Sequence, residues 1–146
     1  MEINYQQMKI NIKKLSEDAV IPQYATKGSA CFDLVASCNG AVNPDFIFST
    51  GLAFEIPNNH VMLIFSRSGM GFKDGVRLAN CVGVIDSDYR GEVKVKLTTD
   101  HNKKLYSKGE RIAQAMIIPY EQVEFVLTDQ LVDTERGAGG FGSSGA

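Results

Sequence analysis

Residues 83–93 read Gly83-Val84-Ile85-Asp86-Ser87-Asp88-Tyr89-Arg90-Gly91-Glu92-Val93. A short apolar run breaks into an acidic turn and then resumes as a strand in which apolar and charged residues alternate. The turn carries two carboxylates, an aromatic ring and a guanidinium between two glycines. A turn alone does not require so many functional side chains. We expect a tight hairpin here, because a carboxylate fixed by such a turn can hold a water molecule against an electrophile.

The alternation of apolar and polar residues extends from this stretch over most of the chain. It continues through residues 93–97 and recurs at residues 8–13, and a period of two residues is typical of strands. Residues 47–48, 51–56, 61–65, 112–118 and 123–127 are rich in β-branched and aromatic residues and predict further strands. One short helix is expected to begin near Ser68, a candidate N-cap, and to end by Gly75. The sequence therefore predicts an all-β sandwich, jelly roll or barrel.

Length and charge limit the classes of function. The chain has 146 residues, and its 15 basic and 17 acidic residues give a net charge of −2. This length fits one domain, and the charge leaves no broad basic face for a nucleic-acid polymer. No apolar run approaches the ~20 residues of a membrane span, and the N-terminus does not read as a secretory signal. We therefore expect a cytoplasmic protein, or one of the host cytosol if a phage or virus encodes it.

The cysteines and histidines give no sign of a metal centre. Cys31, Cys38 and Cys81 include no C-x-x-C pair, and His60 and His101 each lack a neighbour at metal-ligand spacing. An odd number of such cysteines argues against a disulfide framework and against a zinc site. We expect all three thiols to be inert.

The C-terminal residues differ from the rest of the chain. Residues 136–145 hold five of the 14 glycines together with Arg136 and Phe141. A glycine-rich terminus is commonly a frayed tail. It can also close over a ligand, where Phe141 would offer a flat ring to a base and the backbone N–H groups would face phosphates.

Five segments resemble, in chain order, the five motifs of the trimeric dUTPases: residues 28–34, 66–71, 83–93, 109–114 and the tail from Arg136. The most specific are G-V-I-D-S-D-Y-R-G-E at residues 83–92 and G-G-F-G-S-S-G at residues 139–145, and the order and spacing hold from about residue 25 onward. Cys31 and Phe32 depart from the pattern, because the family commonly has Gly-Tyr there.

The resemblance implies both a fold and a reaction. The fold would be a distorted jelly roll or β-barrel of the dUTPase type, with one short helix and a flexible glycine-rich tail. Residues 1–146 would form one domain, with a β core at 1–127 and an arm and tail at 128–146 that close the active site. The reaction would be hydrolysis of dUTP to dUMP and pyrophosphate in a homotrimer with sites at its subunit interfaces. This reaction limits uracil incorporation into DNA and supplies dUMP for dTMP synthesis.

The resemblance also assigns roles in the 83–93 segment. Asp86 would be the general base that deprotonates the water attacking the α-phosphorus, although the residue alone also fits a turn Asp that caps its own backbone. Asp88 is the rival carboxylate and would support the turn. Tyr89 would lie under the deoxyribose and leave no room for a 2′-hydroxyl, although a Tyr covering a sheet edge is equally ordinary.

The remaining assignments concern the base, the phosphates and the metal. The resemblance places uracil recognition at Asn80 and the backbone of Gly83, Val84 and Ile85, which would also exclude the methyl group of thymine. Substrate binding, chiefly of the phosphates, is assigned to Arg67, Ser68, Gly69, Lys94, Gln114 and Arg136. Phe141 would stack on uracil as the tail closes, with Gly142 and Ser143 beside it, and Asp33 would support the sugar and metal waters. Mg²⁺ would be held through substrate phosphates and water and not by protein side chains.

Two alternatives stay open at this point. A dCTP deaminase-like enzyme would share the fold and the handling of a triphosphate, but that family lacks this glycine-rich tail. A non-catalytic dUTPase-like protein would bind nucleotide or a protein partner as a regulator.

Overall fold

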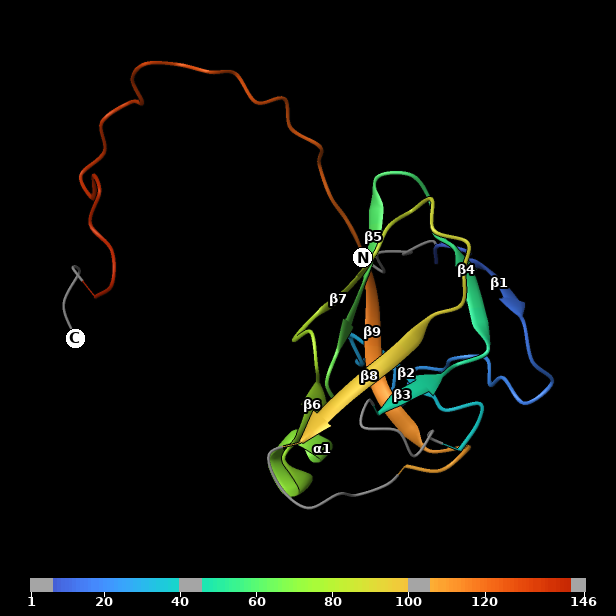
Figure 1. The fold of residues 1–146 in the computed structure, drawn as a ribbon. Coiled ribbons are helices and arrows are strands. Elements are labelled where there is room, and N and C mark those ends of the chain that lie inside the picture. Colours follow the sequence, from blue (N-terminus) through green and yellow to red (C-terminus); the bar gives the residue numbers. More distant parts are fainter. Residues whose placement is uncertain (1–6, 40–45, 100–105, 143–146) are drawn as a thin grey trace.

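The described elements are short strands and one helix, which alternate along residues 7–39, 46–99 and 106–142 of this computed structural model. Figure 1 shows them in order: β1 (Asn11–Lys14), β2 (Phe32–Val35), β3 (Ile47–Ser49), β4 (Leu52–Glu55), β5 (His60–Phe65), α1 (Ser68–Asp74), β6 (Val76–Leu78), β7 (Gly83–Ile85), β8 (Lys94–Thr99) and β9 (Arg111–Pro119). The prediction of an all-β fold with one short helix is confirmed.

The strands form three antiparallel sheets. Their orders are β2-β9-β5-β7, β3-β8-β6 and β1-β4, and the sheets do not close on one another within the described residues. Most partners lie far apart in sequence, as β2 and β9 do. Strands β2 and β6, of four and three residues, were not predicted.

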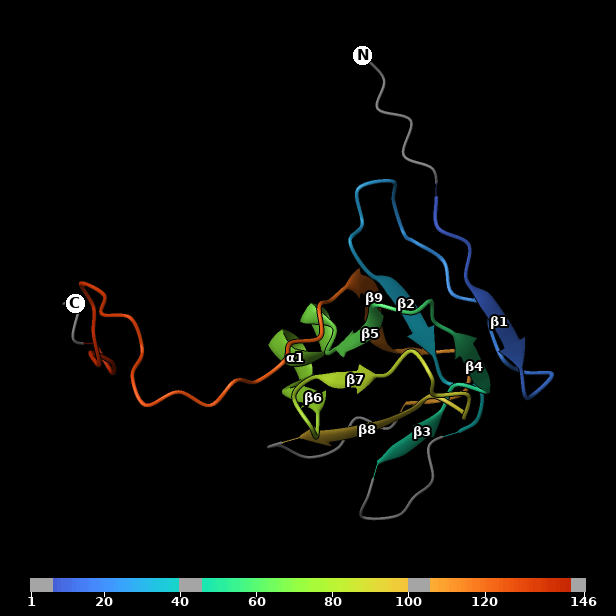
Figure 2. The same ribbon diagram turned by 90° about the horizontal axis from the view of Figure 1, so that it is seen from above.

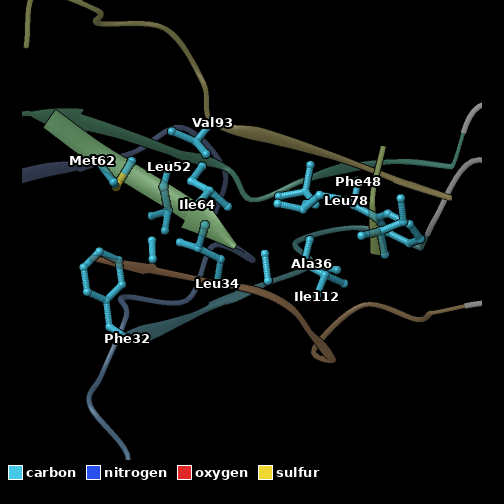
Figure 3. Packing of buried hydrophobic residues seen from close by; sticks show 14 of the residues in the cluster. Phe32, Leu34, Ala36, Phe48, Leu52, Met62, Ile64, Leu78, Val93 and Ile112 are labelled. Carbon is cyan, nitrogen blue, oxygen red and sulfur yellow. The ribbon is translucent and has the colours of Figure 1, made fainter. Parts of the chain in front are cut away.

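The core lies between the two larger sheets (Figure 3). Leu34, Phe48, Leu52, Met62 and Ile112 expose at most 1% of their surface. Each such side chain stabilises the fold by about 1.5–3 kcal/mol relative to leaving it in water. In β8 the alternation is as predicted, since Val95 and Leu97 are buried whereas Lys94 and Lys96 point outward. The outward face of this strand is therefore available to a site.

Helix α1 is short and is held by one buried side chain, Met70. It ends at Gly75, whose φ of 62° lies in the left-handed region and whose N–H donates to the carbonyl of Met70. The prediction of Ser68 as N-cap is wrong. Arg67 occupies that position with extended dihedrals and no side-chain cap, and its carbonyl accepts from the N–H groups of Met70 and Gly71. Ser68 is already helical, so its hydroxyl is not used as a cap.

The predicted hairpin at residues 83–93 is also wrong. Strand β7 pairs with β5, whereas β8 pairs with β3 and β6 in the other sheet. Residues 86–93 therefore connect two sheets. The expected turn does exist, because the N–H of Tyr89 donates to the carbonyl of Asp86 at 3.2 Å. A period of two tells which side of a strand is buried, but it does not tell which strand lies beside it.

The strand predicted at residues 123–127 is absent from the structure. Among the described residues, the last backbone hydrogen bond that ties this end to the body runs from the N–H of Tyr120 to the carbonyl of Asn59 at 2.9 Å. Beyond it the described chain carries no strand and extends away from the sheets in both views (Figures 1 and 2). Phe125 and Leu127 are 93% and 98% exposed. A strand forms only where a partner edge lies alongside it, and residues 123–127 run away from the sheets (Figures 1 and 2).

Helix α1 has seven residues. Within the described ranges, no helix is therefore long and apolar enough to cross a bilayer.

Candidate active site

The predicted site residues fall into two separate hollows, the turn that follows β7, and the C-terminal arm. The first, which we call the α1 hollow, measures about 340 Å³ and includes in its lining Asp33, Arg67, Ser68, Gly69, Arg111 and Gln114. The second, the β7 hollow, measures about 410 Å³ and includes Asn80, Gly83, Val84, Ile85 and Lys94. The two linings share no residue.

The α1 hollow is organised by the carboxylate of Asp33. Oδ1 accepts from Nε of Arg67 at 2.9 Å, and Oδ2 accepts from Nη1 of Arg111 at 3.3 Å. Asp33 and Arg67 expose only 21% and 26% of their side chains, so this pair is partly shielded from water. One carboxylate against two guanidinium groups leaves an excess positive charge in the hollow, which favours an anion.

The strands bring these side chains to one place. Asp33 on β2 lies opposite Gln114 on β9, and Gln114 in turn lies opposite Phe65 on β5. Nε2 of Gln114 donates to the carbonyl of Ser66 at 2.9 Å. This bond ties β9 to the segment that leads into α1, so the amide is fixed at the edge of the hollow.

Arg111 is a site residue that the sequence reasoning missed. Its side chain is 55% exposed, lines the α1 hollow and shares Asp33 with Arg67. The available signal was its position within the 109–114 segment, three residues before Gln114.

Cys31 lines the same hollow. Burial raises the pKa of its thiol, and the nearby Asp33 carboxylate raises it further. The thiol therefore stays protonated at neutral pH, which agrees with the expectation that it is not a nucleophile.

The β7 hollow lies along a strand edge. Strand β7 is the last strand of its sheet, so the backbone groups on its outer side are not used in that sheet. Asn80 lies in the tight turn before β7, which is closed by bonds from Cys81 N–H to Leu78 O at 3.3 Å and from Val82 N–H to Asn80 O at 2.7 Å. Cys81 adopts a φ of 62° there, which a residue with a Cβ disfavours.

Asp86 follows directly after β7 and is exposed. It holds the turn through its backbone carbonyl, which accepts from Tyr89 N–H. Within the described part of the chain, its carboxylate makes no hydrogen bond or ion pair, so the alternative of a side chain that caps its own turn is not what the structure has. Arg90 braces the turn instead, since its Nη1 donates to the carbonyls of Ser87 at 2.6 Å and Tyr89 at 3.2 Å. The backbone at Asp86 is therefore held by the turn, and its carboxylate is available.

Tyr89 leaves the turn with a ring that is 44% exposed. Its hydroxyl donates to the backbone carbonyl of Glu92 at 3.0 Å. The carboxylate of Glu92 lies 3.6 Å from Nζ of Lys94, so Lys94 is held near the same turn.

The tail residues lie away from both hollows. Arg136 takes part in a turn closed by Gly139 N–H at 3.1 Å, and Phe141 and Gly142 are exposed near the end of the described arm (Figure 1). Ser143 lies outside the described residues. Within one chain, the described part of the tail therefore lies next to neither hollow.

The described residues contain no group of three His, Cys, Asp or Glu side chains that could cage a metal ion. Both oxygens of Asp33 are already used by arginines.

Comparison with known proteins gives a consistent result. A family model described as dUTPase matches residues 17–145. The deoxyuridine 5′-triphosphate nucleotidohydrolase of Nautilia profundicola is 49% identical over 141 residues, which cover 94% of this chain and 99% of that protein. The enzyme of the same name from a Hydrogenobaculum species is 45% identical over 142 residues, with the same coverage.

Among solved structures, the Staphylococcus bacteriophage 80alpha dUTPase with dUPNHPP superposes with a TM-score of 0.85 at 28% identity, covering 96% of this chain and 100% of that chain. The likeness confirms the predicted jelly-roll type of fold.

Proposed function

Because this chain belongs to the dUTPase family and is a dUTP diphosphatase, we propose that it hydrolyses dUTP by attack of water on the α-phosphorus, with Asp86 as general base and Mg²⁺ on the triphosphate. The observation that carries the assignment of Asp86 is its exposed carboxylate, which stands on a hydrogen-bonded turn directly after β7 and is free of described protein partners. In the cell this reaction limits uracil incorporation into DNA and supplies dUMP for dTMP synthesis.

Uracil would bind in the β7 hollow. The outer edge of β7 offers backbone donors and acceptors, and the amide of Asn80 offers one of each kind. A uracil edge has the same mixture of groups. Close packing against Gly83, Val84 and Ile85 would leave no room for a methyl group at C5, so dTTP would be rejected.

The phosphates would bind in the α1 hollow. Arg67 and Arg111 supply positive charge, and Asp33 fixes both guanidinium groups before the ligand arrives. Gln114 would lie beside the α-phosphate, and the hydroxyl of Ser68 and the backbone of Gly69 would complete the contacts. Such fixed positive groups stabilise the charge that develops on the phosphoryl oxygens during transfer.

Mg²⁺ bound to the triphosphate would neutralise part of its charge and hold its conformation. The residues that would face its waters are Asp33 and Asp86, and neither forms a cage for the ion. The proton removed from the attacking water would pass to Asp86, and pyrophosphate would leave from the α-phosphorus.

A homotrimer would explain why the site is divided. The two hollows and the tail are separate within one chain, whereas a symmetric oligomer can bring the α1 hollow of one subunit against the β7 hollow of the next. The arm supports this arrangement, because it exposes an apolar series that one subunit alone leaves in water: Val123, Phe125, Val126, Leu127, Leu131 and Val132. Exposed apolar stretches of this kind mark interfaces.

Pyrophosphate release from dUTP, dTTP, dCTP and UTP in the presence of Mg²⁺ tests the proposal. We expect turnover of dUTP far above that of the other three nucleotides, and its loss on chelation of the metal. Ammonia released from dCTP would indicate a deaminase, and nucleotide binding without any turnover would indicate a regulator.

A further inference from the structure

We propose that Gly91 is a positioning residue for sugar selection, because the absence of a side chain there lets the ring of Tyr89 occupy the position from which it excludes a 2′-hydroxyl. This inference rests on the proposed function and on the role that the family resemblance implies for Tyr89, in which its ring would lie under the deoxyribose.

The ring of Tyr89 lies directly against the backbone of Gly91. A Cβ placed on Gly91 would lie 2.6 Å from Cζ and 3.0 Å from Cε2 of this ring, and closer still to its hydroxyl oxygen. Real Cβ atoms essentially never approach another heavy atom below 3.0 Å. The hydroxyl reaches past Gly91 to donate to the carbonyl of Glu92 at 3.0 Å, so the ring can make this bond only where position 91 lacks a side chain.

The backbone that follows Gly91 is firmly held. Oε1 of Glu92 accepts from the N–H of Gly51 at 2.9 Å. The carbonyl of Val93 accepts from Oγ1 of Thr50 at 2.6 Å, and the N–H of Val93 donates to Leu52 at 2.9 Å. Val93 itself is only 1% exposed. Residues 92–93 are thus fastened to the β3–β4 connection and cannot give way to a new side chain.

The ring is the part that can move. It is 44% exposed and is held by a single side-chain hydrogen bond. An alanine at position 91 would therefore turn the ring away and break its bond to Glu92, while the fold stays intact. The groups that bind uracil and the phosphates come from other residues. The main consequence would therefore be that the space beside C2′ of the sugar opens and admits a hydroxyl group.

Steady-state kcat/KM for dUTP and for UTP tests this in four proteins: wild type, Gly91→Ala, Tyr89→Ala and the double variant. We expect Gly91→Ala to lower the preference for dUTP over UTP by about tenfold, within the range that one small group in a pocket provides. Because Gly91 acts through Tyr89, the double variant should show the same preference as Tyr89→Ala alone. Lys13→Ala is the control, since Lys13 is exposed on β1 and lines neither hollow, and its preference should equal that of the wild type.

The outcomes separate this inference from the proposed function. If Tyr89→Ala lowers the preference for dUTP and Gly91→Ala does not, the role of Gly91 is wrong. A further loss when Gly91→Ala is added to Tyr89→Ala would also overturn it. If Tyr89→Ala itself leaves the preference unchanged, the proposed contact of Tyr89 with the sugar is wrong. A Gly91→Ala chain that fails to fold would show that the backbone yields in place of the ring, which contradicts the proposal.

Discussion

The α1 hollow and the β7 hollow are built in different ways. The α1 hollow is made of charged side chains that hold one another, with Asp33 bonded to Arg67 and Arg111. The β7 hollow is made of a strand edge and a tight turn, with Lys94 and Lys96 in its lining and the turn of Asp86 beside it. The α1 hollow has the paired guanidinium groups but, among its described residues, lacks a free carboxylate. The β7 hollow has a free carboxylate beside it but no arginine in its described lining, so each supplies groups that the other lacks.

The largest effect expected from this division is on Asp86. Asp86→Asn keeps the shape of the turn, because the turn uses the backbone carbonyl, but it removes the base. Turnover of dUTP should fall by about a thousandfold, as for loss of a general base, while the dissociation constant for dUTP changes little. Rapid-quench turnover and calorimetric binding measure the two quantities.

The matched control is Asp88→Asn, which alters the other carboxylate of the same turn. It should keep turnover within about threefold of the wild type, the range of a substitution away from the chemistry. Retained turnover in Asp86→Asn together with loss of turnover in Asp88→Asn would mean that Asp88, and not Asp86, is the general base.

Deletion of residues 136–146 tests whether the tail belongs to the site. Within the described residues, this part of the arm packs against neither hollow, so the thermal midpoint should be unchanged. Turnover should fall by about a hundredfold, because closure excludes water and adds phosphate contacts. Arg136→Ala and Phe141→Ala should each lower turnover by less than this hundredfold. Full activity after deletion would mean that the tail is frayed chain.

A smaller effect is expected in the α1 hollow. Asp33→Asn removes the charge that holds both guanidinium groups, so Arg67 and Arg111 would repel each other and lose their fixed directions. We expect kcat/KM for dUTP to fall by about tenfold, mostly through KM. Arg111→Lys keeps the charge without the guanidinium geometry and should be milder than Arg111→Ala. If all three variants have the same kinetics as the wild type, the ion-pair network does not contribute to substrate binding.

The smallest effect concerns the turn that carries Asn80. Cys81 has a φ of 62°, so Cys81→Gly should stabilise the protein by about 1 kcal/mol through relief of a disfavoured backbone conformation. Chemical denaturation measures this change. Cys38→Gly is a suitable control, because Cys38 is an exposed cysteine without a positive φ, and it should not stabilise. Lower stability of Cys81→Gly would show that the thiol contributes more than the backbone costs.

Local pattern and tertiary placement account for what the sequence could and could not predict. Alternation located β1 and β8, and richness in β-branched and aromatic residues located β4, β5 and β9. The second signal failed for residues 123–127, because a strand also needs a partner edge. The Asp86 turn followed from local residues. The Asp33–Arg111 pair and the packing of Tyr89 on Gly91 did not, because they depend on register between strands and on a ring's direction, which no residue spacing reveals.

Subunit mixing tests most directly whether the two hollows meet across an interface. Asp86→Asn disables the β7 side and Arg67→Ala disables the α1 side, and each homotrimer should be nearly inactive. After the two are mixed in equal amounts and allowed to exchange subunits, sites with both intact halves form in mixed trimers.

For random assembly in a cyclic trimer, about a quarter of the wild-type turnover should return. Mass spectrometry of the mixture verifies that exchange has occurred. Mixed trimers that stay as inactive as their parents would contradict the account, because both halves of each site would then come from one chain.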